Sequence, residues 1–243
     1  MTDIKKTFDD IVKKRRSVRI FDSNLPFDEG AVKRSLQRAI LSPNSSNMQL
    51  WKFYRIRSKA ALKTMHGICL NQQSVKTARE LIVFVCPLHE WKHRCDYNIQ
   101  PFLPQNGEGF TNPSQKKVYQ YYKKIIPALY ENDVFGIKGL FRKLYVTFLG
   151  LKKPMYREVM KSDVRVIAHK SCALAAQTFM LSMSCEGYAS CPLEGFDSKR
   201  LLKFLKLPHG YEVNMVIAVG PEGKNGVFGE QRRISLDKLC NTL

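Results

Sequence analysis

One uninterrupted apolar run, residues 81–86, constrains the fold of this chain more than any other feature. The run has the sequence Leu-Ile-Val-Phe-Val-Cys and is closed by Pro87. A short apolar run that ends at a proline is typical of a strand buried on both faces. A second run, residues 213–219, predicts another buried strand, and a shorter strand is expected at 53–57.

Helical periodicity predicts three main helices around these strands. Apolar residues at positions 4, 8, 11 and 12 indicate a first helix, from about residue 3 to residue 14. Asp28 can cap the second helix, which stops at Pro43. The longest helix spans about 163–187, and its small or unbranched residues at 171–178 permit close helix packing. These elements give an α+β sandwich, and a length of 243 residues favours a single domain.

The stretch 87–162 has a different character. It contains several prolines and a Gly-Glu-Gly sequence, followed by two basic amphipathic stretches. In the second stretch, large apolar residues fall on one helical stripe with basic residues beside it. The stripe consists of Ile137, Leu140, Phe141, Leu144, Tyr145 and Phe148, and the flanking residues are Lys138, Arg142 and Lys143. We interpret residues of about 90–160 as a basic, aromatic-rich insertion laid over the core.

The chain is strongly basic, with 40 lysines and arginines, 21 acidic residues and a formal net charge of +19. Residues 116–170 contribute +9 of this charge, from 13 basic and 4 acidic side chains. Such an excess attracts nucleic acid, anionic lipid or phosphorylated cofactors, although it also suits a solvated surface. No recognised nucleic-acid motif accompanies the aromatic and basic residues of this region.

Several features predict a cytoplasmic protein without a structural metal. The chain has no run of roughly 20 apolar residues that could cross a bilayer, and its N-terminus has no apolar signal region. The seven cysteines are odd in number and form no Cys-x-x-Cys pair, as expected for a reducing compartment. The sequence Cys-x-x-His-x-x-x-His-x-Cys at 86–95 has the side chains of zinc ligands, but its spacing fits no common zinc finger.

Two basic turns could hold a phosphate. The turn 15–19, Arg-Arg-Ser-Val-Arg, follows the first helix and supplies guanidinium groups and a hydroxyl donor. Near the C-terminus, a glycine-spaced turn at 220–229 leads into Arg232 and Arg233. Taken alone, each turn could equally be a solvated surface turn.

Two further segments could border a heterocycle. The run 42–51, Ser-Pro-Asn-Ser-Ser-Asn-Met-Gln-Leu-Trp, forms a tight loop of hydroxyl and amide side chains, although a capped turn would look the same. The segment 191–197, Cys-Pro-Leu-Glu-Gly-Phe-Asp, is an apolar loop before a helix that Asp197 can cap. Its backbone N–H groups are therefore free for a ligand.

In this order and spacing, the four segments resemble the nitroreductase family of FMN enzymes. The family pattern is R-x-S-x-R-x-F, then S-P-S-S-x-N-x-Q-P-W, then P-x-E-G-F-D after a long central helix, and an arginine near the C-terminus. The resemblance covers 8–86 and 160–240 and hardly extends to 87–160. It implies a central, mostly antiparallel sheet flanked by helices, in a homodimer whose subunits share their domains.

The resemblance implies a role for each matching residue. The FMN phosphate would be held by Arg15, Arg16, Ser17, Arg232 and Arg233. Arg19 would lie near the pyrimidine end of the flavin ring, where a cation stabilises the reduced form, and Asn71 would hydrogen-bond the ring. Ser45, Ser46 and Asn47 would come from the second subunit. The segment formed by Pro192, Leu193, Glu194 and Gly195 would face flavin N5.

Two positions depart from the family pattern. Leu50 replaces the proline of Q-P-W. Ser74 stands where some members have a lysine, and Lys76 is the candidate to take over its role. The second departure leaves the reduction potential of the flavin open.

The resemblance implies an FMN-dependent oxidoreductase that transfers hydride from NADH or NADPH to a small organic acceptor, such as a nitroaromatic or a quinone. The chain shows no catalytic Ser, Cys or His signature, and flavin chemistry requires none. One alternative is a basic module on the same fold that binds nucleic acid or an anionic membrane. Another is a family member with a different reaction, such as dehalogenation or ring fragmentation. For the insertion we favour a lid over the flavin pocket.

Overall fold

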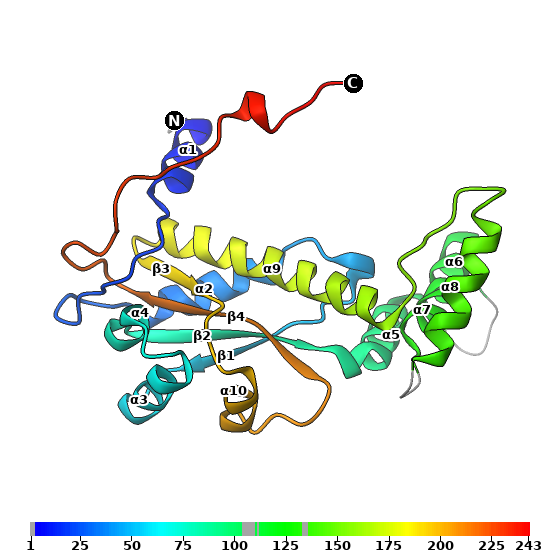
Figure 1. Cartoon of the computed structure of the whole chain (residues 1–243), viewed down its shortest axis with the longest axis horizontal. Helices are drawn as coiled ribbons and strands as arrows, with labels where there is room; N and C mark the ends of the chain where they lie inside the picture. The colour runs from blue at the N-terminus through cyan, green and yellow to red at the C-terminus, as the bar shows by residue number, and fades with distance from the viewer. Residues whose placement is uncertain (1–2, 104–109, 111, 133–135) are drawn as a thin grey trace.

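A four-stranded antiparallel sheet with the strand order β1-β2-β4-β3 forms the centre of the fold (Figure 1). The computed structural model describes residues 3–103, 110, 112–132 and 136–243. The strands are β1 (Lys52–Ile56), β2 (Glu80–Pro87), β3 (Ala189–Leu193) and β4 (Tyr211–Gly220). The three strands expected from the sequence are confirmed. The fourth, β3, occupies residues that the sequence had suggested to be a loop.

Strand β2 is buried along its whole length. Its residues 81, 83 and 85 contact one hydrophobic cluster, whereas residues 82, 84 and 86 contact another, as the two-residue period of a strand requires. The apolar run at 81–86 is therefore uninterrupted because helices cover both faces of the sheet.

Two layers of helices enclose the sheet (Figure 1). The first layer consists of α2 (Glu29–Ala39) and α9 (Lys161–Cys185). The second consists of α3 (Lys59–Ile68), α4 (Gln73–Thr77) and α10 (Ser198–Phe204). The expected caps are present, because Asp28 accepts a hydrogen bond from the Gly30 N–H at 2.7 Å and Asp197 from the Arg200 N–H at 3.0 Å.

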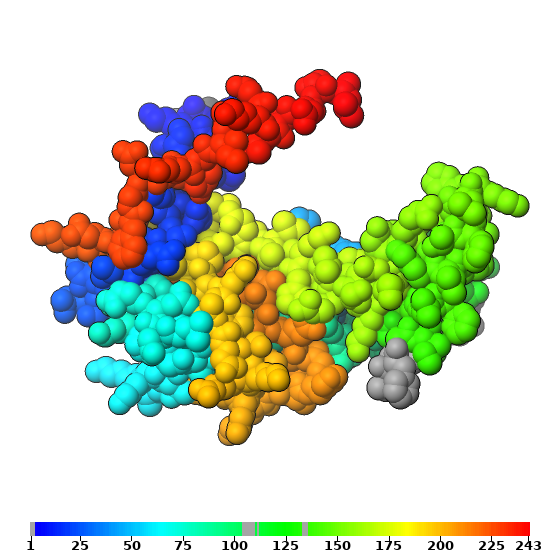
Figure 2. Space-filling view, viewed as in Figure 1, coloured from blue at the N-terminus to red at the C-terminus, as the bar shows by residue number. Residues whose placement is uncertain are grey.

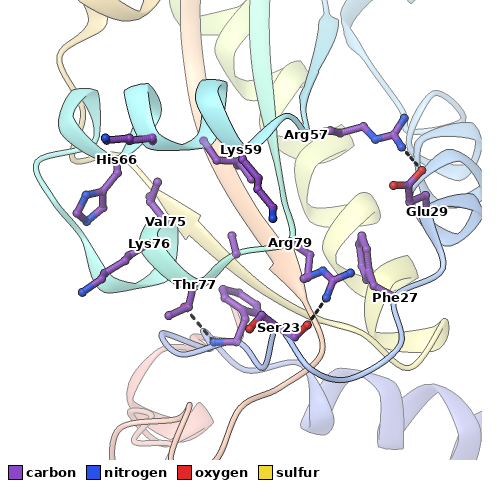
Figure 3. A pocket seen from close by; sticks show the side chains of 14 residues that line it. Ser23, Phe27, Glu29, Arg57, Lys59, His66, Val75, Lys76, Thr77 and Arg79 are labelled. Atoms are coloured by element: carbon purple, nitrogen blue, oxygen red, sulfur yellow. Dashed lines mark hydrogen bonds and ion pairs between the residues drawn. The ribbon is translucent and has the colours of Figure 1, made fainter.

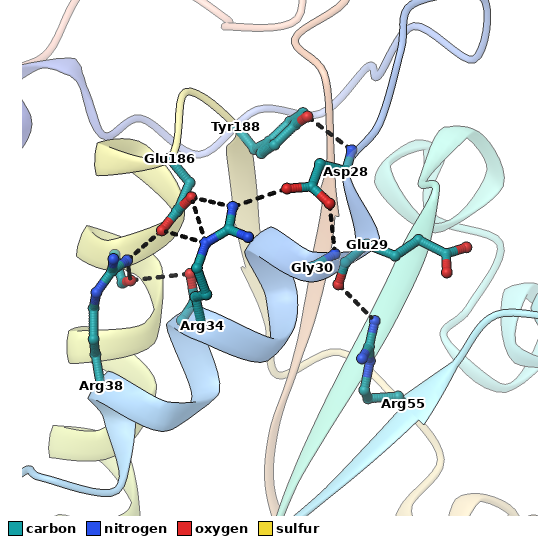
Figure 4. Close-up of polar contacts among 10 residues, drawn as sticks. Asp28, Glu29, Gly30, Arg34, Arg38, Arg55, Glu186 and Tyr188 are labelled. Carbon is teal, nitrogen blue, oxygen red and sulfur yellow. Dashed lines mark hydrogen bonds and ion pairs between the residues drawn. The ribbon is translucent and has the colours of Figure 1, made fainter.

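An ion-pair network joins the two helices of the first layer (Figure 4). Glu186, just after α9, contacts Arg34 at 2.6 Å and Arg38 at 2.5 Å, and Arg34 also contacts Asp28 at 2.8 Å. Hydrogen bonds from Arg34 and then from Arg38 lower the pKa of the Glu186 carboxyl to about 2.

Both ends of the chain lie on the same side of the molecule (Figure 1). Helix α1 (Ile4–Lys14) is held beside α9 by a hydrogen bond of 3.2 Å from the Ser184 hydroxyl to the Ile11 carbonyl. The last residues, 228–243, are all exposed and leave the body of the molecule (Figure 2). We call this segment the tail.

A helical arm projects from the opposite end of the molecule (Figures 1 and 2). It contains α5 (Trp91–Ile99), α6 (Pro113–Gln120), a π-helical turn η4 (Tyr121–Ile125), α7 (Ile126–Tyr130) and α8 (Ile137–Leu149). A third hydrophobic cluster attaches the base of the arm to the loop before β1 and to the start of α9. Its members include Met48, Leu50, Tyr122, Ile126, Tyr130, Val164 and Ala168.

The arm corresponds to the expected insertion, but the apolar stripe of α8 faces solvent in the single chain. Short 3-10 turns complete the structure: η1 (Ser45–Asn47), η2 (Leu88–Glu90), η3 (Gln100–Phe102) and η5 (Leu236–Lys238). No helix in the described ranges is long and apolar enough to cross a membrane.

Candidate active site

The basic turn after α1 is fixed between β3 and the glycine turn that follows β4. Ser17 forms a parallel bridge with Ser190, and the Val18 N–H donates to the Ser190 carbonyl at 3.1 Å. The Arg19 N–H donates to the Gly226 carbonyl at 2.6 Å. A Cβ atom at Gly226 would lie 2.6 Å from the Ile20 carbonyl oxygen, so this close approach requires glycine. The backbone thus holds the 15–19 turn against the 220–226 turn.

Four arginines, Arg15, Arg16, Arg19 and Arg233, lie near these turns and act electrostatically on one another or on the Cys191 thiol, and we call them the arginine cluster. Burial, and then the positive charges of Arg233 and Arg16, lower the pKa of the half-buried Arg15 guanidinium. Arg19 and Arg15 both act electrostatically on the thiol of Cys191 in β3. The Arg16 guanidinium donates to the Gly229 carbonyl at 3.0 Å.

Positive charge is therefore concentrated without a matching carboxylate. Among the described residues, no carboxylate forms an ion pair with any member of the arginine cluster. An anion between these side chains would relieve the repulsion that lowers the pKa of Arg15, and guanidinium groups suit the oxygens of a phosphate. The cluster therefore fits the phosphate of FMN.

The end of β3 and the turn before α4 form a second side of this site. The Gln72 side chain donates to the Gly195 carbonyl at 2.7 Å, and the Asp197 N–H donates to the Ile68 carbonyl at 2.9 Å. Asn71 is exposed beside this loop and has a left-handed backbone, with φ of +57°. A Cβ atom at Gly195 would lie 3.0 Å from the Gln72 amide nitrogen, so a larger residue there would have to displace the Gln72 side chain.

The predicted residues 192–195 differ in accessibility. Glu194 and Gly195 are exposed, Pro192 is half-buried, and the Leu193 side chain belongs to the core. Only the backbone of Leu193 is therefore a candidate for ligand contact.

Neither Ser74 nor Lys76 supplies a cation to this site. Ser74 is buried and hydrogen-bonds the Cys191 thiol behind β3. Lys76 instead lines a separate cavity of 980 Å³ together with Phe21, Thr77 and Arg79 (Figure 3).

The predicted residues Ser45, Ser46 and Asn47 lie far from the arginine cluster in the single chain. The Ser45 N–H donates to the Ser171 hydroxyl at 3.2 Å, near the middle of α9, whereas Ser184, near the end of α9, contacts α1 just before Arg15. Residues 171 and 184 are separated by about 20 Å at 1.5 Å per helical residue. One chain therefore does not bring these two groups together.

The turn that contains Ser46 has an unusual backbone. Ser46, Asn47 and Gln49 all have positive φ angles, of 52°, 46° and 47°, a conformation that is costly for residues other than glycine. Contacts from the arm hold it: Tyr122 donates to the Ser46 carbonyl at 2.8 Å, and the Tyr121 and Ser46 hydroxyls are 2.6 Å apart. Asn98 and Asn47 exchange two hydrogen bonds, of 3.0 and 2.8 Å.

Sequence reasoning missed these supporting residues. The signal that could have found Tyr121 and Tyr122 was a pair of hydroxyl donors in the basic, aromatic stretch of the insertion. Arg232 and Arg233 lie in the exposed tail, where the Arg233 guanidinium donates to the Arg232 carbonyl at 2.6 Å.

The possible zinc ligands at 86–95 do not converge, and no metal-binding group was found in the described part of the chain.

The family model described as the nitroreductase family matches residues 12–221, which is most of the chain and includes the arm. The chain belongs to the nitroreductase family. The predicted oxidoreductase class is therefore confirmed, as are the α+β fold and its antiparallel sheet.

Three similar proteins illustrate this membership. Protein DrgA of Synechocystis is 27% identical over 238 residues, which is 96% of this chain and 94% of that protein. An oxygen-insensitive NADPH nitroreductase of Helicobacter pylori is 22% identical over 200 residues, covering 81% of this chain and 78% of its own length. A protein from Exiguobacterium sibiricum, solved in complex with FMN, superposes with a TM-score of 0.68 at 20% identity, covering 100% of this chain and 98% of that one.

Proposed function

We propose that this nitroreductase-family chain binds FMN and transfers hydride from NADH or NADPH to a small organic acceptor, such as a nitroaromatic or a quinone. The arginine cluster carries this proposal, because several arginines that have no paired carboxylate in the described chain suit an anion. The FMN complex of the Exiguobacterium protein and the NADPH-dependent name of the Helicobacter relative support the choice of cofactor and donor.

The residues of the site would divide the work of binding. Arg15, Arg16, Ser17 and Arg233 hold the phosphate, with Arg232 next to them in the tail. Arg19 lies on the β3 side of the cluster, where its charge favours an electron-rich ring. Asn71 and the N–H groups at Glu194 and Gly195 then hydrogen-bond the edge of the ring. Bound FMN supplies the hydride chemistry, so the chain needs no nucleophile of its own.

The site is completed by a second copy of the chain in this proposal. The Ser46 turn lies about 20 Å from the arginine cluster along α9, so it serves the cofactor of the other subunit. Two exposed surfaces suit such a homodimer: the α9 face around Ala173, Leu174 and Gln177, and the tail, whose apolar residues Ile234, Leu236 and Leu239 are 63–73% exposed. A two-fold axis perpendicular to α9 would run the two copies of this helix antiparallel, bring each Ser46 turn towards the other chain's arginine cluster and create two equivalent sites.

The visible absorption spectrum of the purified protein tests the proposal directly. We expect a yellow protein that releases FMN on denaturation and loses its flavin absorbance under anaerobic NADH or NADPH. A colourless protein that does not take up added FMN would contradict the proposal and would favour the alternative of a basic binding module.

A further inference from the structure

Helix α8 presents its large apolar side chains to solvent. Six of them, which we call the α8 face, are between 47% and 79% exposed. They are Leu140, Phe141, Leu144, Tyr145, Phe148 and Leu151. All but Leu151 recur along one side of the helix, and Leu151 follows its end in the same register. A surface of this kind in water marks an interaction site.

The contacts on the opposite side of α8 fix this orientation. Gly139 and Val146 are the buried residues of the helix, and a Cβ atom at Gly139 would lie 3.7 Å from the Met160 Cα atom. The Arg142 guanidinium donates to the carbonyl oxygens of Ala128 at 2.6 Å and Glu131 at 2.8 Å. The small and polar residues thus attach α8 to the arm, and the large apolar residues point away from it.

Helix α8 and the turn after it carry only positive charge, and Glu131, just after α7, pairs with Lys138 at 3.3 Å. Residues 137–153 contain five basic side chains and no acidic one. Successive residues of a helix are rotated by about 100°, so Lys138 and Lys143 lie at the two edges of the apolar stripe. Lys152 and Lys153 are exposed beside Leu151, and neither forms an ion pair within the residues described.

We propose that the α8 face docks on an anionic lipid surface, with its apolar side chains among the acyl chains and its lysines at the headgroups. A helix of 13 residues is too short to cross a bilayer, which takes roughly 20 residues, but it can lie in the interface. Aromatic side chains such as Phe141, Tyr145 and Phe148 suit that depth. This inference goes beyond the proposed function and does not depend on it.

Two other partners fit the α8 face less well. A contact between the α8 faces of two copies would bring the lysines of one face towards those of the other, including Lys152 and Lys153. Nucleic acid would pair with the lysines but would leave the leucines and phenylalanines in water. Anionic lipid matches both the charge and the apolar surface.

The test is flotation of the full-length protein with lipid vesicles. We expect binding to vesicles that contain phosphatidylglycerol, weaker binding at high ionic strength, and little binding to pure phosphatidylcholine. Phe141→Asp and Phe148→Asp should each weaken binding by about tenfold or more. The double variant Lys152→Gln/Lys153→Gln should weaken binding to the anionic vesicles by about tenfold.

Leu25→Asp is the matched control, because Leu25 is 46% exposed and lies outside the arm. It should bind vesicles like the parent protein. Equal binding of the parent and the Phe141→Asp/Phe148→Asp variant would overturn the proposal. The proposal would also fail if the parent protein bound neither kind of vesicle and the double substitution changed the sedimentation coefficient of the protein. The α8 face would then be a contact between copies of the chain. Lipid would also be excluded as the partner if the parent protein bound duplex DNA but no vesicles, and if the same substitutions left the DNA binding unchanged.

Discussion

The hydroxyl group of Tyr122 donates a hydrogen bond of 2.8 Å to the carbonyl oxygen of Ser46. This bond connects the arm to a turn with three left-handed residues. The arm is therefore more than a covering of the core, because it stabilises the turn that would reach the cofactor of a second subunit in the proposed dimer.

Loss of the Tyr122 hydroxyl should disturb that turn. We expect Tyr122→Phe to lower the free energy of unfolding by about 1 kcal/mol, since the partly buried Ser46 carbonyl loses its donor. In the proposed dimer it should also weaken FMN binding, which fluorescence titration would measure. Tyr119→Phe is the control, because its hydroxyl forms no hydrogen bond within the described residues. If Tyr122→Phe and the parent protein bind FMN with equal affinity, the Ser46 turn does not contribute to the cofactor site.

Removal of cations from the arginine cluster should weaken the phosphate site. Arg15→Ala and Arg233→Ala should each cost about 1.5–3 kcal/mol of FMN binding free energy, the value of a charge-assisted hydrogen bond. The flavin-to-protein absorbance ratio after purification and the Kd of added FMN check this expectation. Arg57→Ala, which removes an exposed arginine paired with Glu29, should keep the flavin content of the parent. Full flavin content in both cluster variants would show that the phosphate binds elsewhere.

Disruption of the α9 face should produce monomers. Leu174 is 47% exposed between small residues of α9, and Leu174→Arg would place a charge at the centre of the proposed interface. Sedimentation velocity should show a dimer for the parent protein and for Leu25→Arg, but a flavin-poor monomer for Leu174→Arg. Removal of residues 230–243 should also lower dimer stability, because the apolar side chains of the tail are exposed in one chain and would be covered in the proposed dimer. A stable, flavin-loaded monomer of the parent chain would be evidence against the shared site.

The network around Glu186 should make stability depend on pH. Because Arg34 and Arg38 lower the pKa of Glu186 from 4.5 to about 2, the folded state binds the proton less readily than the unfolded state. The stabilisation is complete above the unfolded value and is lost as the pH falls from 4.5 towards 2. Glu186→Gln should therefore cost about 1 kcal/mol at neutral pH and progressively less in acid. Urea unfolding across this pH range, with Glu158→Gln as the exposed control, measures the difference.

Local sequence determined much of the fold. The apolar run 81–86 and the helical periodicity of 163–187 are properties of consecutive residues, and both were found as β2 and α9. Caps such as Asp28 and Asp197 act on N–H groups within three residues, so they too were predictable from local patterns. The order of the four motifs was enough to indicate the nitroreductase family.

Only the tertiary structure decided which residues lie together. β3 has no strand pattern of its own, and it becomes a strand because β4 supplies hydrogen-bond partners. The contact of Tyr122 with Ser46 spans 76 positions, and the direction of the α8 face depends on how Gly139 and Arg142 attach the helix. A helical stripe shows that apolar residues share a side, but only the packing of small and polar residues opposite them determines that this side faces solvent.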